Sequence, residues 1–285
     1  MKAKLAFKSQ EGKRAVLKAY ESLLEQWPSP NEQFHVNTRY GDTFIIATGE
    51  KEAPPLILLH GSAMNSAMWL GDAGEYSRNY RVYAVDIPGE PGKSDEKQLP
   101  FEGRAFAEWL YDVCNALSIE KVSLIGLSLG AWLAVKFSVC HPEKVDKLVL
   151  FCPAGIGGQR TSFLFKVLAY ALLGEAGMDK LYKKVNGNQP LPEAVLEYQK
   201  LIGKNFNYRR EGIPLFPDGE LRRLTMPVAL FVGEKDAMFH SLQTAKRLES
   251  ILPHANINIL PGAGHTLINL VDRIMAFLAP EKNFL

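Results

Sequence analysis

The sequence of 285 residues has few cysteines and almost no net charge. It holds three cysteines, Cys114, Cys140 and Cys152, at spacings that match no metal-binding motif. A small, odd number of cysteines argues against a disulfide framework and favours small apolar side chains in a reducing compartment. The formal net charge is +2, without a basic block or an acidic tail. The charge pattern therefore provides no electrostatic reason to expect nucleic acid or an anionic membrane as a partner.

Long apolar runs are also missing. The basic residues at the N-terminus are not followed by the apolar stretch and cleavage site of a signal peptide. The longest apolar segment, residues 163–173, contains Lys166 and is too short to span a bilayer. We therefore expect a soluble, cytoplasmic protein that has no membrane partner. We also expect it to exist as a monomer or a homodimer.

The sequence does contain a regular alternation of short apolar runs with helix-length segments. An amphipathic helix at 12–27 and a hairpin at 34–48 come first. The apolar runs that follow are residues 56–59, 81–85, 122–125, 148–151, 228–232 and 257–260. Helical segments lie around 102–117, 129–140, 241–251 and 269–278. Because the runs are apolar throughout, they predict strands covered on both faces, in a mostly parallel central sheet flanked by helices.

One interval lacks strand-like runs. Between residues 155 and 224, three helical segments appear near 161–173, 175–185 and 192–206. We expect this insertion to form a helical cap over the carboxyl ends of the strands. The predicted division is a core of residues 1–154 and 225–285, with an N-terminal helical extension at 1–30, and a cap at 155–224.

Ser128 lies at the centre of Gly126-Leu127-Ser128-Leu129-Gly130, between an expected strand and an expected helix. A serine between two glycines at a strand–turn–helix junction is the pattern of a nucleophile elbow. A turn this sharp needs neighbours without side chains, because the nucleophile itself is held in a strained conformation. The alternative is a serine that caps the helix or is simply buried.

A serine hydroxyl needs a base before it can act as a nucleophile. Of the six histidines, His265 is the candidate, because it follows the strand at 257–260 on a loop that begins with Gly-Ala-Gly. His240 is a weaker alternative. His141 and His254 stand next to prolines at apparent helix ends, and we expect both at the surface.

The imidazole in turn needs an acid that selects its tautomer and stabilises its cation. Asp236 is the candidate, four residues after the expected strand at 228–232. Glu234 is the alternative, and Asp272 is expected to point outward from the last helix. The chain order of Ser128, Asp236 and His265 is one of the three orders known for such triads.

An ester-cleaving site also needs backbone donors for the developing oxyanion. The N–H of Leu129, at the helix start, is one candidate, and the N–H of Ser62, in the loop after the strand at 56–59, is the other. His60 is expected to organise that loop rather than to react. Apolar residues expected to line the substrate pocket are Met64, Phe163, Phe165, Leu168, Met178 and Met238.

Together these residues resemble the α/β-hydrolase fold superfamily over about residues 34–280. The resemblance rests on His60-Gly61, the elbow at 126–130, Asp236 and His265. Residues 86–94, "DIPGEPGKS", resemble the D-x-x-G-x-G-x-S turn of that superfamily with one extra residue. More narrowly, the helix ending in "WP" and the segments "NTRYGDTFIIATGEKEAPPLILLHG" and "YAVDIPGEPGKS" are similar to Bacillus-type carboxylesterases of the arylpropionate-ester (NP) group. The resemblance implies an esterase with a helical cap. With the triad, this makes a serine carboxylesterase the leading hypothesis, and the apolar residues expected to line the pocket predict a small or medium hydrophobic ester as its substrate.

The same three residues serve other functions as well. A lactonase, an amidase, a carbon–carbon bond hydrolase and a perhydrolase remain open, as does a receptor that binds a small molecule on a hydrolase fold. We expect neither a metal nor an organic cofactor, because the sequence has no HExxH, no Cys/His cluster and no G-x-G-x-x-G after the first strand.

Overall fold

Eight strands form the centre of the structure, a computed structural model that describes residues 5–187, 192–209 and 211–280, apart from the side chains of Leu164, Leu168 and Ala171. The strands are β1 (Asn31–Thr38), β2 (Gly41–Thr48), β3 (Pro55–Leu59), β4 (Arg81–Val85), β5 (Val122–Leu127), β6 (Val145–Phe151), β7 (Val228–Gly233) and β8 (Asn256–Leu260). They make one sheet in the order β1-β2-β4-β3-β5-β6-β7-β8.

The sheet is mostly parallel. The β1–β2 and β2–β4 pairs are antiparallel, and all other neighbours run parallel. The chain crosses from β3 to β4 on one side and then returns past β3 to β5, so the strand order reverses between β3 and β5. In open α/β sheets, ligands bind outside the carboxyl ends of the strands at such a switch point.

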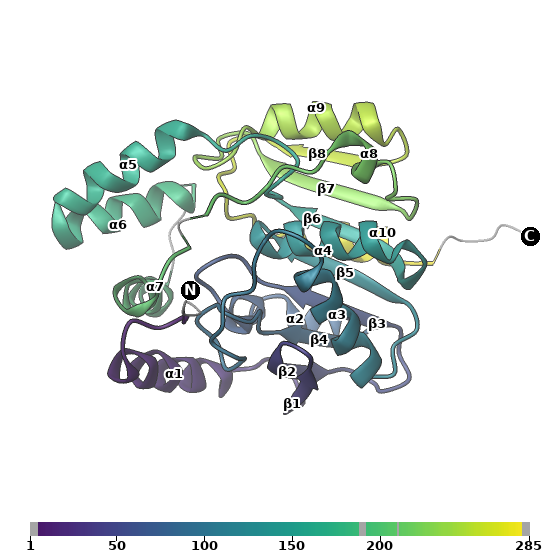
Figure 1. Cartoon of the computed structure of the whole chain (residues 1–285), viewed down its shortest axis with the longest axis horizontal. Helices are drawn as coiled ribbons and strands as arrows, with labels where there is room; N and C mark the ends of the chain where they lie inside the picture. The colour runs from purple at the N-terminus through teal and green to yellow at the C-terminus, as the bar shows by residue number, and fades with distance from the viewer. Residues whose placement is uncertain (1–4, 188–191, 210, 281–285) are drawn as a thin grey trace, which may run out of the picture.

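Helices cover both faces of the sheet, as expected for this fold class (Figure 1). They are α1 (Gln10–Leu24), α2 (Ala73–Tyr76), α3 (Ala105–Ala116), α4 (Leu129–Cys140), α5 (Thr161–Leu172), α6 (Gly174–Val185), α7 (Glu193–Asn205), α8 (Asp218–Leu221), α9 (Ser241–Ile251) and α10 (Val271–Leu278). Two short 3₁₀ helices, Ser66–Trp69 and Pro142–Lys144, complete the elements.

Two apolar cores lie on opposite faces of the sheet, because neighbouring residues of a strand point in opposite directions. On β3, Ile57 and Leu59 pack in the core with α3, α4, α8 and α9. Leu56 and Leu58 pack in the other core with α1, α2 and α10. This two-sided burial is the physical reason for the mainly apolar runs of β3, β5 and β7.

Strand β8 differs from the expectation of full burial. It lies at the edge of the sheet, pairs with β7, and leaves Ile259 41% exposed. The apolar run predicted the strand correctly, but it did not distinguish an edge position from a central one.

Helices α5, α6 and α7, which we call the inserted helices, connect β6 to β7 through α8. Figure 1 shows α5 and α6 side by side at the left of the view, with α7 below them and next to α1. The three helices were predicted with nearly these bounds. None of the helices among the described residues combines the length and the apolar character needed to cross a membrane.

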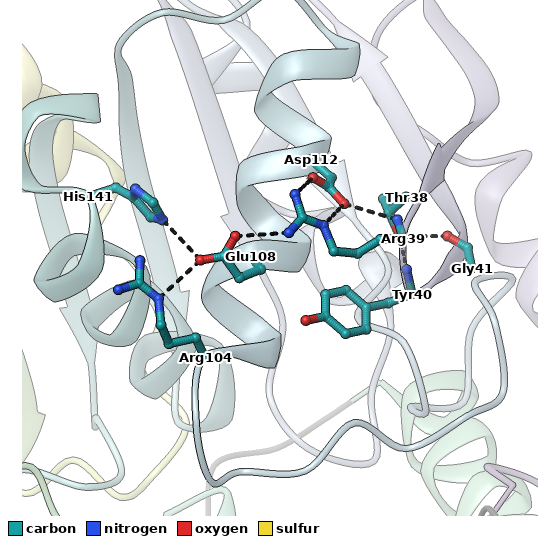
Figure 2. A network of polar contacts seen from close by, with 8 residues as sticks. All are labelled: Thr38, Arg39, Tyr40, Gly41, Arg104, Glu108, Asp112 and His141. Carbon is teal, nitrogen blue, oxygen red and sulfur yellow. Dashed lines mark hydrogen bonds and ion pairs between the residues drawn. The ribbon is translucent and has the colours of Figure 1, made fainter.

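A polar network joins the β1–β2 hairpin to α3 (Figure 2). Arg39 donates two side-chain hydrogen bonds to Asp112, at 2.8 and 2.9 Å, and a third to Glu108 at 3.1 Å. His141 lies 3.9 Å from the same Glu108, and its ring centroid is 4.8 Å from that of Tyr111. The side chain of His141 is only 14% exposed, because the end of α4 packs against α3. The expected surface position of His141 was therefore wrong.

Candidate active site

Ser128 occupies the expected junction between β5 and α4. Its φ of 54° and ψ of −106° are strained for a residue with a side chain. A Cβ at Gly126 would lie 2.5 Å from the backbone of Gly130, and a Cβ at Gly130 would overlap the carbonyl oxygens of Leu59 and His60. The two glycines therefore allow close approach of backbones, whereas the unusual φ is on Ser128 itself.

The backbone on both sides of Ser128 is tied to the neighbouring strand β6. The Ser128 N–H donates to the Phe151 carbonyl at 2.9 Å, and the Ser128 carbonyl accepts from the Ala154 N–H at 3.3 Å. The elbow is thus held in place by the last residue of β6 and by the segment that follows it.

Asp236 and His265 are hydrogen-bonded, although 29 residues separate them in the sequence. The Nδ1 of His265 lies 2.8 Å from Oδ2 of Asp236, and both side chains are buried. The other carboxylate oxygen of Asp236 accepts the N–H groups of Met238 at 2.6 Å and Phe239 at 3.1 Å. With Asp236 ionised, this arrangement places a proton on Nδ1 of His265 and leaves Nε2 free to act as a base.

The electrostatics of Asp236 favour its ionised form. Burial by itself raises the pKa of Asp236, but the hydrogen bond and charge of His265 and the two backbone N–H donors outweigh it, so that the pKa lies below its ordinary value. The alternative acids do not take this place. Glu234 is exposed and accepts the Gly262 N–H at 2.9 Å, and Asp272 is exposed on α10.

The end of α6 contacts the loop that carries His265. The His265 N–H donates to the Val185 carbonyl at 3.1 Å, and the Thr266 hydroxyl donates to Asn186 Oδ1 at 2.5 Å. A Cβ at Gly187 would lie 2.8 Å from the Gly264 nitrogen, so the two loops touch backbone to backbone. The inserted helices therefore reach the His265 loop directly.

Residues 60–66 follow β3, and we call them the oxyanion loop because they include Ser62, an expected oxyanion donor. A Cβ at Gly130 of the elbow would lie 2.6 Å from the His60 carbonyl oxygen, so the start of the loop lies beside the elbow. His60 is buried, and its Nε2 accepts the Ile87 N–H at 2.9 Å while Nδ1 lies 2.8 Å from the Gly61 carbonyl. Burial lowers the pKa of His60, which keeps the ring neutral in this role. His60 thus organises the loop, as expected.

The two expected oxyanion donors are the N–H groups of Ser62 and Leu129. Leu129 is the first residue of α4, where a helix leaves its N–H groups without partners inside the helix. Neither N–H has a hydrogen-bond partner among residues 5–187, 192–209 and 211–280. Both are therefore available to a ligand.

Known proteins resemble this chain over most of its length. Residues 56–277 match the model of the alpha/beta hydrolase family. The chain belongs to that family. It is 37% identical over 259 residues to carboxylesterase YbfK of Bacillus subtilis, covering 87% of this chain and 86% of that protein. The crystal structure of that protein superimposes with a TM-score of 0.82 over 94% of this chain and 98% of the other, at 35% identity.

A second relative of this hydrolase is naproxen esterase (carboxylesterase NP) from Bacillus subtilis. Its crystal structure superimposes with a TM-score of 0.84 at 31% identity, covering 95% of this chain and all of that one. The expected resemblance to Bacillus carboxylesterases of the NP group is confirmed.

The residues expected to line the substrate pocket of this hydrolase fall into three groups. Met64, Phe163, Met178 and Met238 are half-buried. Phe165 is 74% exposed on α5, which packs mainly against α6, and we therefore leave it out of the proposed pocket. The side chain of Leu168 lies outside the described residues.

Two features of the site were not predicted from the sequence. The Cys152 sulfur, a carboxylate oxygen of Asp236 and a ring nitrogen of His265 all lie within 4.8 Å of one another. Nothing in the sequence pattern indicates this grouping. Burial and the neighbouring Asp236 raise the pKa of the Cys152 thiol, which disfavours a reactive thiolate. The second feature is Glu90, which is buried beside the oxyanion loop. The extra residue in the 86–94 turn is the sequence feature that could have indicated it.

Proposed function

We propose that this hydrolase is a serine carboxylesterase that cleaves small to medium hydrophobic esters through an acyl-enzyme on Ser128. The buried Asp236–His265 hydrogen bond of 2.8 Å carries the proposal. Asp236 and His265 follow β7 and β8, and Ser128 follows β5, so all three belong to the carboxyl ends of parallel strands. The identity to the Bacillus carboxylesterases supports the same conclusion.

The proposed reaction begins when Nε2 of His265 takes the proton of the Ser128 hydroxyl and the oxygen attacks the ester carbonyl. Asp236 stabilises the imidazolium that forms. The carbonyl oxygen becomes an oxyanion, which accepts hydrogen bonds from the N–H groups of Ser62 and Leu129. Its charge is further stabilised by the positive end of the α4 dipole.

Collapse of this intermediate breaks the ester C–O bond, and His265 gives its proton to the leaving alcohol. A water molecule then loses a proton to His265 and attacks the acyl-enzyme, and the acid is released as Ser128 regains its proton. These steps use neither a metal nor an organic cofactor.

The proposed substrate preference rests on apolar, half-buried residues of the oxyanion loop, the Asp236 segment and the inserted helices. Met64 belongs to the oxyanion loop, Met238 follows Asp236, and Phe163 and Met178 belong to α5 and α6. Side chains of this type favour an apolar acyl or aryl group over a charged one. On this view, residues 155–224 act as a cap and the rest of the chain as the catalytic core.

Two measurements on purified protein test the proposal. We expect rapid labelling by a fluorophosphonate and repeated turnover of p-nitrophenyl butyrate, whereas Ser128→Ala abolishes both and leaves the thermal midpoint nearly unchanged. Hydrolysis by Ser128→Ala at a rate close to that of the wild type would show that the nucleophile is misassigned. A panel of p-nitrophenyl esters of increasing chain length measures the size of the acyl pocket.

The same experiment separates the alternatives. Tight binding with about one slow turnover per molecule would favour a small-molecule receptor over an esterase. Faster turnover of a lactone, an amide or a carbon–carbon bond than of any ester in the panel would assign the triad to that chemistry. The cytoplasmic location and the monomeric or homodimeric state stay predictions, which cell fractionation and size-exclusion chromatography test.

A further inference from the structure

The carboxylate of Glu90 is buried behind the oxyanion loop and contacts the middle of that loop. Its Oε2 accepts the Ala63 N–H at 2.7 Å and lies 3.5 Å from the Ser62 hydroxyl. Ala63 is the residue directly after the expected oxyanion donor. Glu90 therefore holds the peptide next to the one whose N–H is expected to face the substrate.

The backbone at this contact is strained. Ala63 has a φ of 56°, in the left-handed region that residues with a Cβ rarely adopt. Such a conformation persists only where its surroundings hold it in place, and it is concentrated at functional sites. The charge-assisted hydrogen bond from Ala63 to Glu90 is a contact that holds it.

The charge of Glu90 is balanced by Arg209. The Arg209 Nε lies 3.7 Å from Oε1 of Glu90, and the side chains are 8% and 0% exposed. The guanidinium stacks over Phe101, 4.7 Å from the ring centroid, and donates to the Leu99 carbonyl at 2.7 Å. Arg209 follows α7, so the pair joins the end of the inserted helices to the core.

This ion pair is a costly arrangement for stability alone. Oε1 of Glu90 and both Nε and Nη2 of Arg209 lack hydrogen-bond partners within the described part of the chain. Burial raises the pKa of Glu90 to about 7, in spite of the Ala63 N–H and Arg209. Buried charges with incomplete hydrogen bonding stabilise a fold less than apolar residues of the same size would. A role in the site explains why a carboxylate is present here.

The ends of the oxyanion loop are anchored independently of Glu90. His60 accepts the Ile87 N–H at 2.9 Å, and Asp86 accepts both the N–H and the hydroxyl of Ser66, at 2.9 and 2.7 Å. The side chain of Asn65 donates to the Pro91 carbonyl at 2.8 Å. Loss of the Glu90 contact therefore releases the middle of the loop and leaves its ends in place.

We propose that Glu90 is a positioning residue of the oxyanion hole: its carboxylate holds the Ala63 N–H, which aims the Ser62 N–H at the substrate carbonyl, while Arg209 balances its charge. The proposal rests on the proposed esterase function. It assigns a role to the residue-long extension of the 86–94 turn, because the extra residue lies between Gly89 and Gly92, where Glu90 enters.

Two conservative variants separate the effect of the side-chain length of Glu90 from the effect of its charge. Glu90→Gln keeps an oxygen that can accept the Ala63 N–H but has no charge. Glu90→Asp keeps the charge beside Arg209 but is shorter by one methylene, about 1.5 Å. If the Ala63 contact positions the donor, Glu90→Gln stays within about fivefold of the wild-type kcat. Glu90→Asp then loses about 10- to 100-fold, less than the 10²–10³ expected when an oxyanion donor is removed outright.

The loss should appear in kcat, with KM changed by less than about threefold, because the donor acts mainly in the transition state. A trifluoromethyl ketone, which forms a tetrahedral adduct with its oxygen in the oxyanion hole, should lose affinity for Glu90→Asp in proportion to kcat/KM. Glu96→Gln and Glu96→Asp are the matched controls, since Glu96 pairs with Lys13 at 2.6 Å. Both should retain wild-type kcat.

The outcomes that overturn the inference are distinct from failure of the esterase assignment. If the wild type neither reacts with a fluorophosphonate nor hydrolyses p-nitrophenyl esters, the proposed function is wrong. If the wild type is active and Glu90→Asp keeps its kcat, or Glu90→Gln loses more than Glu90→Asp, Glu90 does not act through the Ala63 contact. A fall in thermal midpoint with unchanged kcat would assign Glu90 a purely structural role.

Discussion

Replacing Asp236 with Asn changes the charge and hydrogen-bonding direction of one side chain while keeping its size. In the native site, one oxygen accepts the N–H groups of Met238 and Phe239, and the other accepts from Nδ1 of His265 at 2.8 Å. An asparagine has only one oxygen, which can accept either from the backbone N–H groups of Met238 and Phe239 or from Nδ1 of His265. Its orientation therefore decides the tautomer of His265.

The two backbone N–H groups compete with the single Nδ1–H of His265 for that oxygen. If the amide oxygen faces Met238 and Phe239, at 2.6 and 3.1 Å, both backbone hydrogen bonds survive and the NH₂ group faces the imidazole. The reverse orientation saves one hydrogen bond and places NH₂ against two N–H groups. We therefore expect NH₂ to face Nδ1, which forces the proton of His265 onto Nε2. That nitrogen then cannot take the proton of Ser128.

The expected loss in kcat is on the order of 10⁴, the size seen when the tautomer is inverted in other serine triads. It corresponds to about 5 kcal/mol of transition-state stabilisation. KM for p-nitrophenyl butyrate should change little, and circular dichroism should show an intact fold. Asp272→Asn, an exposed exchange of the same kind on α10, should retain full activity. A loss of only a few-fold in Asp236→Asn would refute the assignment and direct attention to Glu234.

Two further predictions concern stability. Gly130→Ala should lower the free energy of unfolding in urea by about 3 kcal/mol, because the added Cβ meets the backbone of Leu59 and His60. Gly219→Ala is the control, since a Cβ there lies in open space and should leave the stability unchanged. Equal stability of the two variants would contradict the close approach at the elbow. Burial lowers the pKa of His141 despite the opposing charges of Glu108 and Glu143, so its contribution to stability is complete above about pH 6.5 and declines as the pH falls through that value. His141→Phe keeps a ring beside Tyr111 but has no group that titrates. When the pH is lowered from about 7.5 to about 5.5, the thermal midpoint of this variant should therefore fall by less than that of the wild type.

The strands and the longer helices were predictable because burial leaves a periodic pattern in the chain, whereas the one-turn helices α2 and α8 were not predicted. Apolar runs marked all the parallel strands, and the elbow at Ser128 was identified because two glycines flank a serine at a strand–helix junction. The exposed edge of β8 was not predictable, since an apolar run records a strand's composition and not its place in the sheet. The half-buried position of His141 was missed for a related reason, because a proline marks the end of a helix but not what packs against it.

The chemistry of the site divides in the same way. Local sequence identified Asp236 and His265 as candidates, since each follows a strand on a short loop, and it left Glu234 open. Their hydrogen bond depends on the pairing of β7 with β8, two strands that helix α9 separates in the chain. The buried pair of Glu90 and Arg209 is similar, because 119 residues separate its members. The 86–94 turn draws attention to Glu90, but nothing in the sequence indicates that Arg209 lies beside it.

The amino-acid sequence by itself determined the order of the strands and helices along the chain and the type of each reacting group, because both depend on residues close together. The tertiary structure alone decided which carboxylate contacts which base, and which buried charge lies behind the oxyanion loop. Those outcomes depend on distances of a few ångströms between segments that only the completed sheet and the inserted helices bring together.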